Sequence, residues 1–277
     1  MHVAQIWQYP VKSMIGATVS QARLGGTGVV GDRLWAVRDE QRGGIRGAKK
    51  IGALMRLAAT YDGEGGVVIT LPDGTRVGSA DPDAAARVSA ALDHPVTLAP
   101  LAPASDLDHF RRGAPDSDDV MVELRSIFGR EDDEPLPDFS IFPPELVEFE
   151  SPPGTYVDAF PLMIMTTSAL RSLADALPDS AIDVRRFRPS FVIDSGDEDG
   201  HPELGWAGRT LHIGDAVVQV GAPCPRCVMV TREVDAQLPA DRAILRHIVR
   251  DLDQNVGAYA TVVQPGTIAE GDPVRFG

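Results

Sequence analysis

The chain of 277 residues is long enough for one large domain or two modest ones, and a hydrophobic content of 43% permits a full buried core. A formal net charge of −14 excludes the overall basic surface typical of nucleic-acid-binding proteins and weakens attraction to an anionic membrane surface. The two cysteines do not form a disulfide scaffold, and no signal peptide or membrane span is recognised, so we expect a cytoplasmic protein.

Short strands joined by tight turns dominate the first hundred residues. Alternating side chains predict strands at residues 3–9, 17–24 and 31–39. Residues 67–78 are expected to form a hairpin around a Pro-Asp-Gly turn, and the apolar spacing over 81–92 predicts a short helix. This pattern indicates a small barrel or sandwich.

The composition changes between residues 100 and 153, where acidic residues and prolines dominate. Such a composition is typical of a solvated connector. Long segments in compact domains are also often functional, so a lid over a neighbouring site is the alternative interpretation.

Strand-like and helix-like patterns alternate again after residue 153. The predicted strands lie at 160–165, at the end of a basic segment spanning 182–193, at 206–213 and as a pair within 260–276. The predicted helices lie at 169–177 and 239–253, and the hydroxyl residues at 166–168 are expected to cap the first of them.

Both cysteines lie in one stretch, residues 221–231, where Cys224 and Cys227 are two residues apart beside Arg226. The apolar residues on either side predict a strand, a tight loop and a second strand, with the thiols at the bend. A structural zinc site would need two more ligands, and no two of the six histidines have the spacing that such sites use. A thioredoxin-like dithiol would be followed by a helix, whereas residues 228–230 are strand-like.

Two interpretations of the thiols therefore stay open. Buried cysteines often act as small apolar side chains, which requires no ligand. Alternatively, a thiolate binds a soft metal or carries sulfur, because Arg226 and the backbone N–H groups of a tight turn favour the charged form.

Cations gather in the predicted loops of this acidic protein. The set is Lys12, Arg33, Arg46, Lys49, Lys50, Arg185, Arg186, Arg188 and Arg226. If residues 185–188 are extended, Arg186 and Arg188 point to the same side, and guanidinium groups bind phosphate or carboxylate through two hydrogen bonds. The alternative is that these cations pair with the acidic segment or face water.

Two hydroxyl-bearing loops also suit an anion. Lys12 and Ser13 offer an ammonium, a hydroxyl and backbone donors, while Thr167 and Ser168 lie at a predicted helix N-terminus, where anions bind readily. Plain capping of that helix is the alternative for the second loop. Together these features predict a cofactor with a phosphate or similar anion, held beside a reactive thiol.

Five segments in this order resemble the MOSC proteins, a family named for the C-terminal domain of molybdenum cofactor sulfurase. They are Tyr-Pro-Val-Lys-Ser at 9–13, Gly-Asp-Arg-Leu-Trp at 31–35, Arg-Phe-Arg-Pro at 186–189, Cys-Pro-Arg-Cys at 224–227 and the terminal Pro-Gly-Thr-Ile and Gly-Asp-Pro-Val at 265–274. The most similar branch carries an N-terminal β-barrel domain and includes the mitochondrial amidoxime-reducing component.

The resemblance implies a mostly β fold with helices, of the α+β class, built from two β-barrel-like domains. Residues 1–99 would form the N-terminal MOSC-type β-barrel domain, and residues 154–277 the MOSC domain. Residues 100–153 match no part of the family pattern and are the acidic, proline-rich connector or lid.

The resemblance also implies a molybdenum cofactor, a pterin dithiolene with a terminal phosphate, and assigns Cys227 as catalytic residue and metal ligand, with Cys224 as the alternative. The positions that match cofactor-holding residues are Lys12, Ser13, Arg33, Thr167, Ser168, Arg186, Arg188, Ser190, Pro225 and Arg226. Ser190 stands where relatives have Asn, and its shorter hydroxyl changes the hydrogen bonding available there.

The implied function is a molybdenum-dependent oxidoreductase that reduces small N-hydroxylated molecules. The chain has no further cysteines for an iron–sulfur cluster of its own, so electrons would come from a separate iron–sulfur or flavin reductase. The alternatives are a non-catalytic carrier of the cofactor or of sulfur, and a structural or interaction protein. We expect no nucleic-acid or membrane partner.

Overall fold

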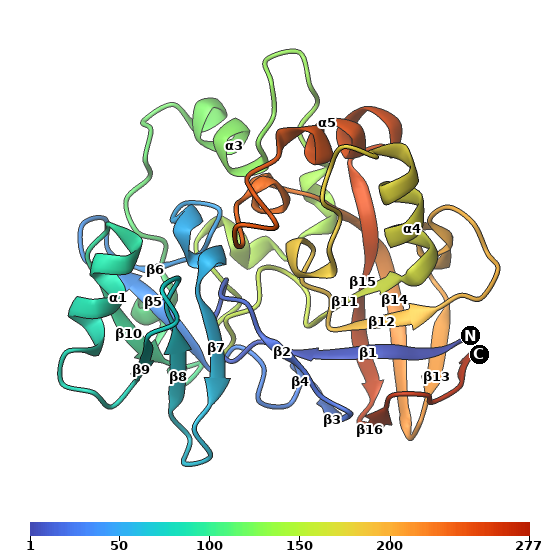
Figure 1. The fold of residues 1–277 in the computed structure, drawn as a ribbon, viewed down its shortest axis with the longest axis horizontal. Coiled ribbons are helices and arrows are strands. Elements are labelled where there is room, and N and C mark those ends of the chain that lie inside the picture. Colours follow the sequence, from blue (N-terminus) through green and yellow to red (C-terminus); the bar gives the residue numbers. More distant parts are fainter.

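The computed structural model describes residues 1–277 and contains one large curled sheet and three small ones (Figure 1). The order of the large sheet is β17 (Val274–Phe276), β13 (Thr210–Ile213), β14 (Ala216–Pro225), β15 (Asn255–Gln264), β11 (Leu162–Thr166), β12 (Phe191–Asp194), β1 (His2–Gln8) and β2 (Ala17–Thr18). The strands β1 and β2 thus extend a sheet that the second half of the chain builds.

Three small sheets of three strands each complete the β structure. They are β16 (Gly266–Ala269) with β3 (Gln21–Gly25) and β4 (Gly28–Val29); β10 (Val96–Pro100) with β5 (Trp35–Asp39) and β6 (Ile45–Arg46); and β7 (Ala58–Tyr61) with β8 (Val67–Thr70) and β9 (Arg76–Gly78). The helices are α1 (Ala84–Leu92), α2 (Leu107–Phe110), α3 (Val120–Phe128), α4 (Thr167–Ala176) and α5 (Arg242–Asp251).

The elements with strong periodicity form where the sequence predicts them. This holds for β1, the β8–β9 hairpin, α1, β11, α4 and α5. The cap of α4 is Thr166, whose Oγ1 accepts a hydrogen bond from the Ala169 N–H at 3.2 Å. Asp241 caps α5 in the same way.

Three predicted strands are shorter or broken. The stretch 17–24 divides into β2 and β3, and the stretch 31–39 is extended only from Trp35 onward. Residues Pro202–Trp206 form a 3₁₀ turn, so the strand predicted at 206–213 begins at Thr210. Trp206 is buried in that turn against the large sheet, because an aromatic side chain can fill the core without belonging to a strand.

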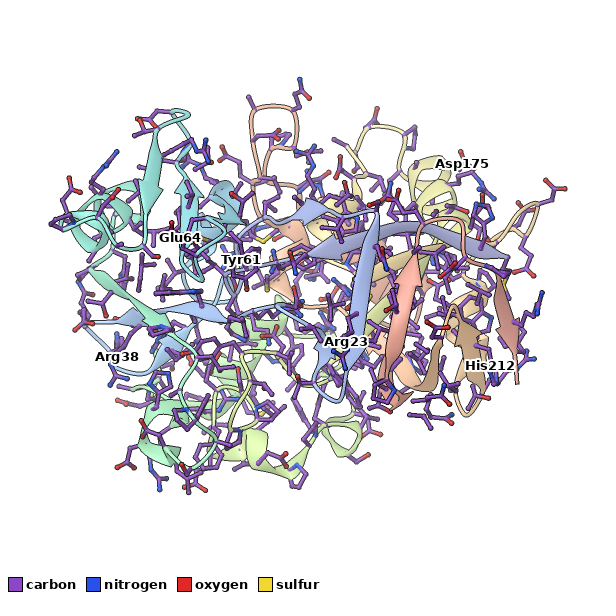
Figure 2. All side chains as sticks on the ribbon, turned by 90° about the horizontal axis from the view of Figure 1, so that it is seen from below. Arg23, Arg38, Tyr61, Glu64, Asp175 and His212 are labelled. Carbon is purple, nitrogen blue, oxygen red and sulfur yellow. The ribbon has the colours of Figure 1, made fainter.

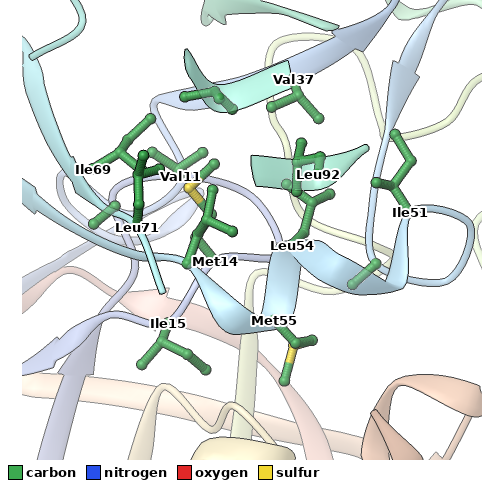
Figure 3. Packing of buried hydrophobic residues seen from close by; sticks show 14 of the residues in the cluster. Val11, Met14, Ile15, Val37, Ile51, Leu54, Met55, Ile69, Leu71 and Leu92 are labelled. Atoms are coloured by element: carbon green, nitrogen blue, oxygen red, sulfur yellow. The ribbon is translucent and has the colours of Figure 1, made fainter. Parts of the chain in front are cut away.

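One of the apolar clusters joins the two halves of the chain. Val11, Met14 and Leu54 lie in a cluster with α1 and the β8–β9 hairpin, and Met229 and Leu238 from the second half pack into the same cluster. Figure 3 shows the part of this cluster around Met14 and Leu54. Each such side chain contributes about 1.5–3 kcal/mol when fully buried, so the cluster holds the N-terminal loops against the cysteine-bearing segment.

The acidic segment forms a structured bridge over the molecule, shown in green in Figure 1. Lys50 of the N-terminal half pairs with Asp116 at 3.1 Å, and Arg246 of α5 pairs with Glu134. Arg130 is buried and donates to the backbone carbonyl of Arg226 at 3.1 Å. The segment is therefore fixed to both halves and to the cysteine-bearing loop.

Charged side chains are spread over the exposed surface of the molecule. Among the residues labelled in Figure 2, Glu64, Asp175 and His212 are exposed. None of the helices has the length and apolar character needed to cross a membrane.

Candidate functional site

A cavity of about 810 Å³ lies where three parts of the chain meet. Its wall includes N-terminal residues from Lys12 to Lys50, residues 112–150 of the acidic segment, and residues 224–227 with the two cysteines. This volume is in the range of small-molecule and cofactor sites.

The thiols lie at the end of a strand rather than at a symmetric bend. Strand β14 continues through Cys224 to Pro225, and Cys224 is 3% exposed, whereas Cys227 is half-buried. Both thiols are free and line the cavity. No group of three or more His, Cys, Asp or Glu side chains is placed to hold a metal ion, so a metal at Cys227 would need ligands from a bound group.

The strand predicted after Cys227 is wrong, because Val228–Thr231 is a 3₁₀ turn. Thr231 donates its hydroxyl to the Val228 carbonyl at 2.8 Å, which closes the turn. Met229 and Val230 pack into two different apolar clusters. The burial of both side chains outweighs the intrinsic preference of these residues for a strand.

Arg226 connects the thiol loop (residues 224–227) to the segment that carries Arg188. Its Nη1 donates to the Cys224 Sγ at 3.1 Å and its Nη2 donates to the Phe187 carbonyl at 2.7 Å. The Nε atom is buried and has no partner. Burial raises the pKa of the Cys224 thiol, and the nearby Arg226 guanidinium offsets only part of that rise.

Two lysines share one carboxylate in the cavity. The Lys12 ammonium, 2% exposed, lies 2.5 Å from Asp158 Oδ1 and donates to the Tyr156 carbonyl at 2.9 Å. Lys49 lies 3.1 Å from the other oxygen of Asp158. Burial opposes the charge of Asp158, but the two ammonium groups outweigh it and hold its pKa well below the usual value.

Lys49 and Asp158 were not among the predicted site residues. Burial disfavours the Lys49 ammonium, yet Asp158 and Cys227 outweigh this effect and raise the pKa of Lys49, which therefore stays charged near the thiol. Lys49 belongs to the set of loop cations in the sequence, so a signal for it existed. Asp158 is one of 40 acidic residues, and nothing in the sequence distinguishes it.

Three predicted site residues have a left-handed backbone: Ser13 with φ 68°, Arg33 with φ 50° and Arg188 with φ 59°. Non-glycine residues rarely adopt this conformation, at a cost of about 1–3 kcal/mol each, and such strain concentrates at functional sites. The Ser13 hydroxyl accepts from the Ala48 N–H at 2.9 Å and so fixes the loop that carries Lys49. Arg33 pairs with Asp32 and lies 5.4 Å from the centre of the Tyr9 ring.

Residues 185–188 are not extended, so the condition under which Arg186 and Arg188 would point to the same side is not met. Val184–Arg186 is a 3₁₀ turn, and Arg188 is left-handed. The fully buried Arg186 side chain donates to three backbone carbonyls, those of Ala181 at 2.9 Å, Arg232 at 3.0 Å and Pro239 at 2.8 Å. Its donor groups are used to hold the fold, although the residue contributes to the cavity wall.

Arg188 lines the cavity and has one donor without a partner. Its guanidinium lies 4.2 Å from the Tyr9 ring centre and donates to the Met14 carbonyl, while Nη2 is buried without a partner. The residue is 7% exposed, and burial lowers its pKa to about 10. A buried cation with an unused donor in a cavity wall favours an anionic ligand.

Thr167, Ser168 and Ser190 do not line the cavity. Ser168 forms a buried hydroxyl network with Thr166 at 3.0 Å and Ser195 at 2.9 Å. The Ser190 hydroxyl accepts from the Met163 N–H at 3.3 Å. These hydroxyls support α4 and the large sheet, which corresponds to the capping alternative for residues 166–168.

Comparison with known families gives two matches that together cover most of the chain. The MOSC N-terminal beta barrel domain model matches residues 1–95, and the MOSC domain model matches residues 152–275. The chain is a MOSC-domain protein with an N-terminal β-barrel domain. The predicted family and the predicted α+β fold class are confirmed, and the MOSC domain supports a function associated with the molybdenum cofactor.

The relatives include a human protein and two bacterial structures. The chain is 26% identical to mitochondrial amidoxime-reducing component 1 of Homo sapiens over 301 residues, covering 98% of this chain and 82% of that protein. The YUAD protein from Bacillus subtilis has 10% identity and a TM-score of 0.46, covering 99% of this chain and 94% of that one. YiiM from Geobacillus stearothermophilus has 17% identity and a TM-score of 0.32, covering 43% and 54%.

Arg185 and Arg186 are neighbours in the chain, but Arg186 is buried and Arg185 is partly exposed. We expect Arg186→Met to lower the free energy of unfolding by about 2–4 kcal/mol, because three buried carbonyls lose their donor. Arg185→Met, which removes part-exposed pairs with Asp183 and Asp235, should cost under about 1 kcal/mol. Urea unfolding of both variants measures the two free energies of unfolding. If both variants lose the same stability, the structural role of Arg186 is contradicted.

The two thiols should differ in reactivity. We expect iodoacetamide at pH 8 to modify Cys227 before Cys224 in the folded, cofactor-free protein, because Cys224 is buried and its raised pKa leaves less thiolate. Peptide mass spectrometry over a time course gives both rates. Faster labelling of Cys224 would contradict the burial of this thiol described above.

Proposed function

We propose that this protein is a molybdenum-cofactor-binding oxidoreductase that reduces small N-hydroxylated molecules. The observation that carries the proposal is that two buried arginines, Arg188 and Arg226, each with one unpartnered donor, line the same cavity as the half-buried Cys227. The similarity to a human amidoxime-reducing component supports the choice of substrate class.

The residues present fit such a cofactor. Guanidinium groups hold phosphate through charged hydrogen bonds, so Arg188 and Arg226 would hold the anionic end of the pterin. A thiolate suits a soft-ligand metal site, so Cys227 would be the protein ligand of molybdenum. Pro225 stiffens the backbone that carries the ligand. Cys224 is the less suitable thiol, because it is buried and accepts a hydrogen bond from Arg226.

The remaining predicted residues would act by positioning. Lys12 joins the N-terminal loop to Asp158, and Ser13 fixes the loop of Lys49 through the Ala48 N–H. Arg33 adds positive charge next to Tyr9 and Arg188. Arg186, Thr167, Ser168 and Ser190 are left out of the proposed contacts, because their polar groups bind the protein itself.

When bound, the cofactor would supply the two-electron chemistry, and the chain would supply orientation and charge. The overall reaction breaks an N–O bond, consumes two electrons and two protons, and releases water. We propose that a separate iron–sulfur or flavin reductase delivers the electrons. A cytoplasmic location and the absence of nucleic-acid and membrane partners stay predictions from composition.

The metal content of the protein tests the proposal. Protein made in a host that synthesises the cofactor should contain about one molybdenum and one pterin per chain. Cys227→Ser should lose most of the molybdenum, whereas the matched variant Cys224→Ser should keep it, because the Cys224 thiol is only 3% exposed and is already bound by Arg226. Elemental analysis and pterin fluorescence give the two contents, and wild-type protein without molybdenum would overturn the proposal.

Turnover separates an enzyme from a carrier. The loaded protein, given an artificial electron donor and benzamidoxime, should form benzamidine. A protein that binds molybdenum through Cys227 but forms no product would instead be the non-catalytic carrier of cofactor or sulfur.

A further inference from the structure

Five aromatic side chains follow one another along the cavity. They are Phe128, Phe139, Phe142, Tyr259 and Phe160, and all five line it. Successive ring centres lie 5.6, 6.2, 6.5 and 4.5 Å apart in this order. We call this row the aromatic wall.

The aromatic wall reaches from solvent to the thiol loop. Among the rings that the acidic segment supplies, Phe139 is 43% exposed. Further along the row, Tyr259 is paired with Ala222 across β14 and β15, next to the residues that precede Cys224. The pKa of Tyr259 is raised by burial and further by the neighbouring Cys224 thiol, in accord with this position.

Packing of the acidic segment alone does not account for the aromatic wall. None of its five rings is fully buried, whereas Phe110, Phe149 and Tyr156 form a nearby buried cluster that performs such packing. The edge-to-face and tilted pairs, at 67°, 44° and 70°, leave ring surface open to the cavity. Open aromatic surface inside a cavity favours a flat apolar ligand.

The same cavity carries the cations, so it offers two chemically distinct surfaces. Lys49, Arg188 and Arg226 suit an anionic group, while the aromatic wall suits an uncharged planar one. A ligand that follows the rings inward from Phe139 arrives beside Tyr259 and the thiol loop.

We infer that the aromatic wall is a specificity site that binds the flat, apolar body of the substrate and makes the protein prefer aromatic N-hydroxylated molecules over small aliphatic ones. This inference rests on the proposed function and names the substrate class within it. Phe142 is the central residue, because its ring joins the rings of the acidic segment to Tyr259.

The test compares benzamidoxime with acetamidoxime on cofactor-loaded protein. Phe142→Leu should weaken benzamidoxime binding, measured by equilibrium dialysis, by roughly three- to tenfold, which is the size of one aromatic contact. The kcat/KM for benzamidoxime should fall by a similar factor, and both values for acetamidoxime should stay unchanged. Phe149→Leu is the matched control, because Phe149 is 7% exposed in the buried cluster and does not line the cavity.

The outcomes separate this inference from the proposed function. Equal effects of Phe142→Leu on both amidoximes, or no effect on either, would overturn the specificity site. If wild-type protein binds benzamidoxime more tightly than acetamidoxime but reduces neither, the proposed reductase fails while the binding role of the aromatic wall holds. A change of preference in Phe149→Leu equal to that in Phe142→Leu would also overturn the inference, since a general loss of packing would then explain both.

Discussion

The placement of Arg188 is the constraint on which the rest of the site depends. Its guanidinium comes from the second half of the chain, lies over Tyr9 and donates to the Met14 carbonyl, both from the N-terminal half. Burying a cation without a direct ion pair costs on the order of several kcal/mol. One carbonyl, one ring face and the charges of Asp32 and Asp158 offset only part of this, because burial still lowers the pKa of Arg188. An anionic ligand bound to the unpartnered Nη2 would offset the remaining cost of burying the Arg188 charge.

The same arrangement explains how two halves of the chain make one cavity. Strand β1 pairs with β12, the strand that follows Arg188, with Ile6 opposite Phe191. This pairing brings the loop of Lys12 and Ser13 to the thiol loop, and the acidic segment then closes the cavity through Arg130, whose guanidinium binds the Arg226 carbonyl. The segment supplies three of the five rings of the aromatic wall, so it contributes to the chemistry of the cavity and not only to its closure.

The sequence predicts those parts of the structure that local periodicity determines. Strand β1, the β8–β9 hairpin and α5 have clear patterns, and five ordered motifs identified the family. The direction of a side chain after an irregular residue is not predictable in this way. The left-handed Arg188, next to a 3₁₀ turn, removes the extended conformation considered for residues 185–188. Met229 and Val230 pack into two different apolar clusters, where a turn stands in place of the expected strand. Asp158 acquires its role only when folding brings Lys12 and Lys49 to it.

The crystal structure of protein purified from a cofactor-competent host tests the central claim most directly. The account predicts molybdenum bound to the Cys227 Sγ, with an anionic group of the pterin within about 3 Å of Arg188 Nη2 or Arg226 Nε. Molybdenum on Cys224, or a cofactor bound elsewhere while both arginine donors stay unpartnered, would contradict it.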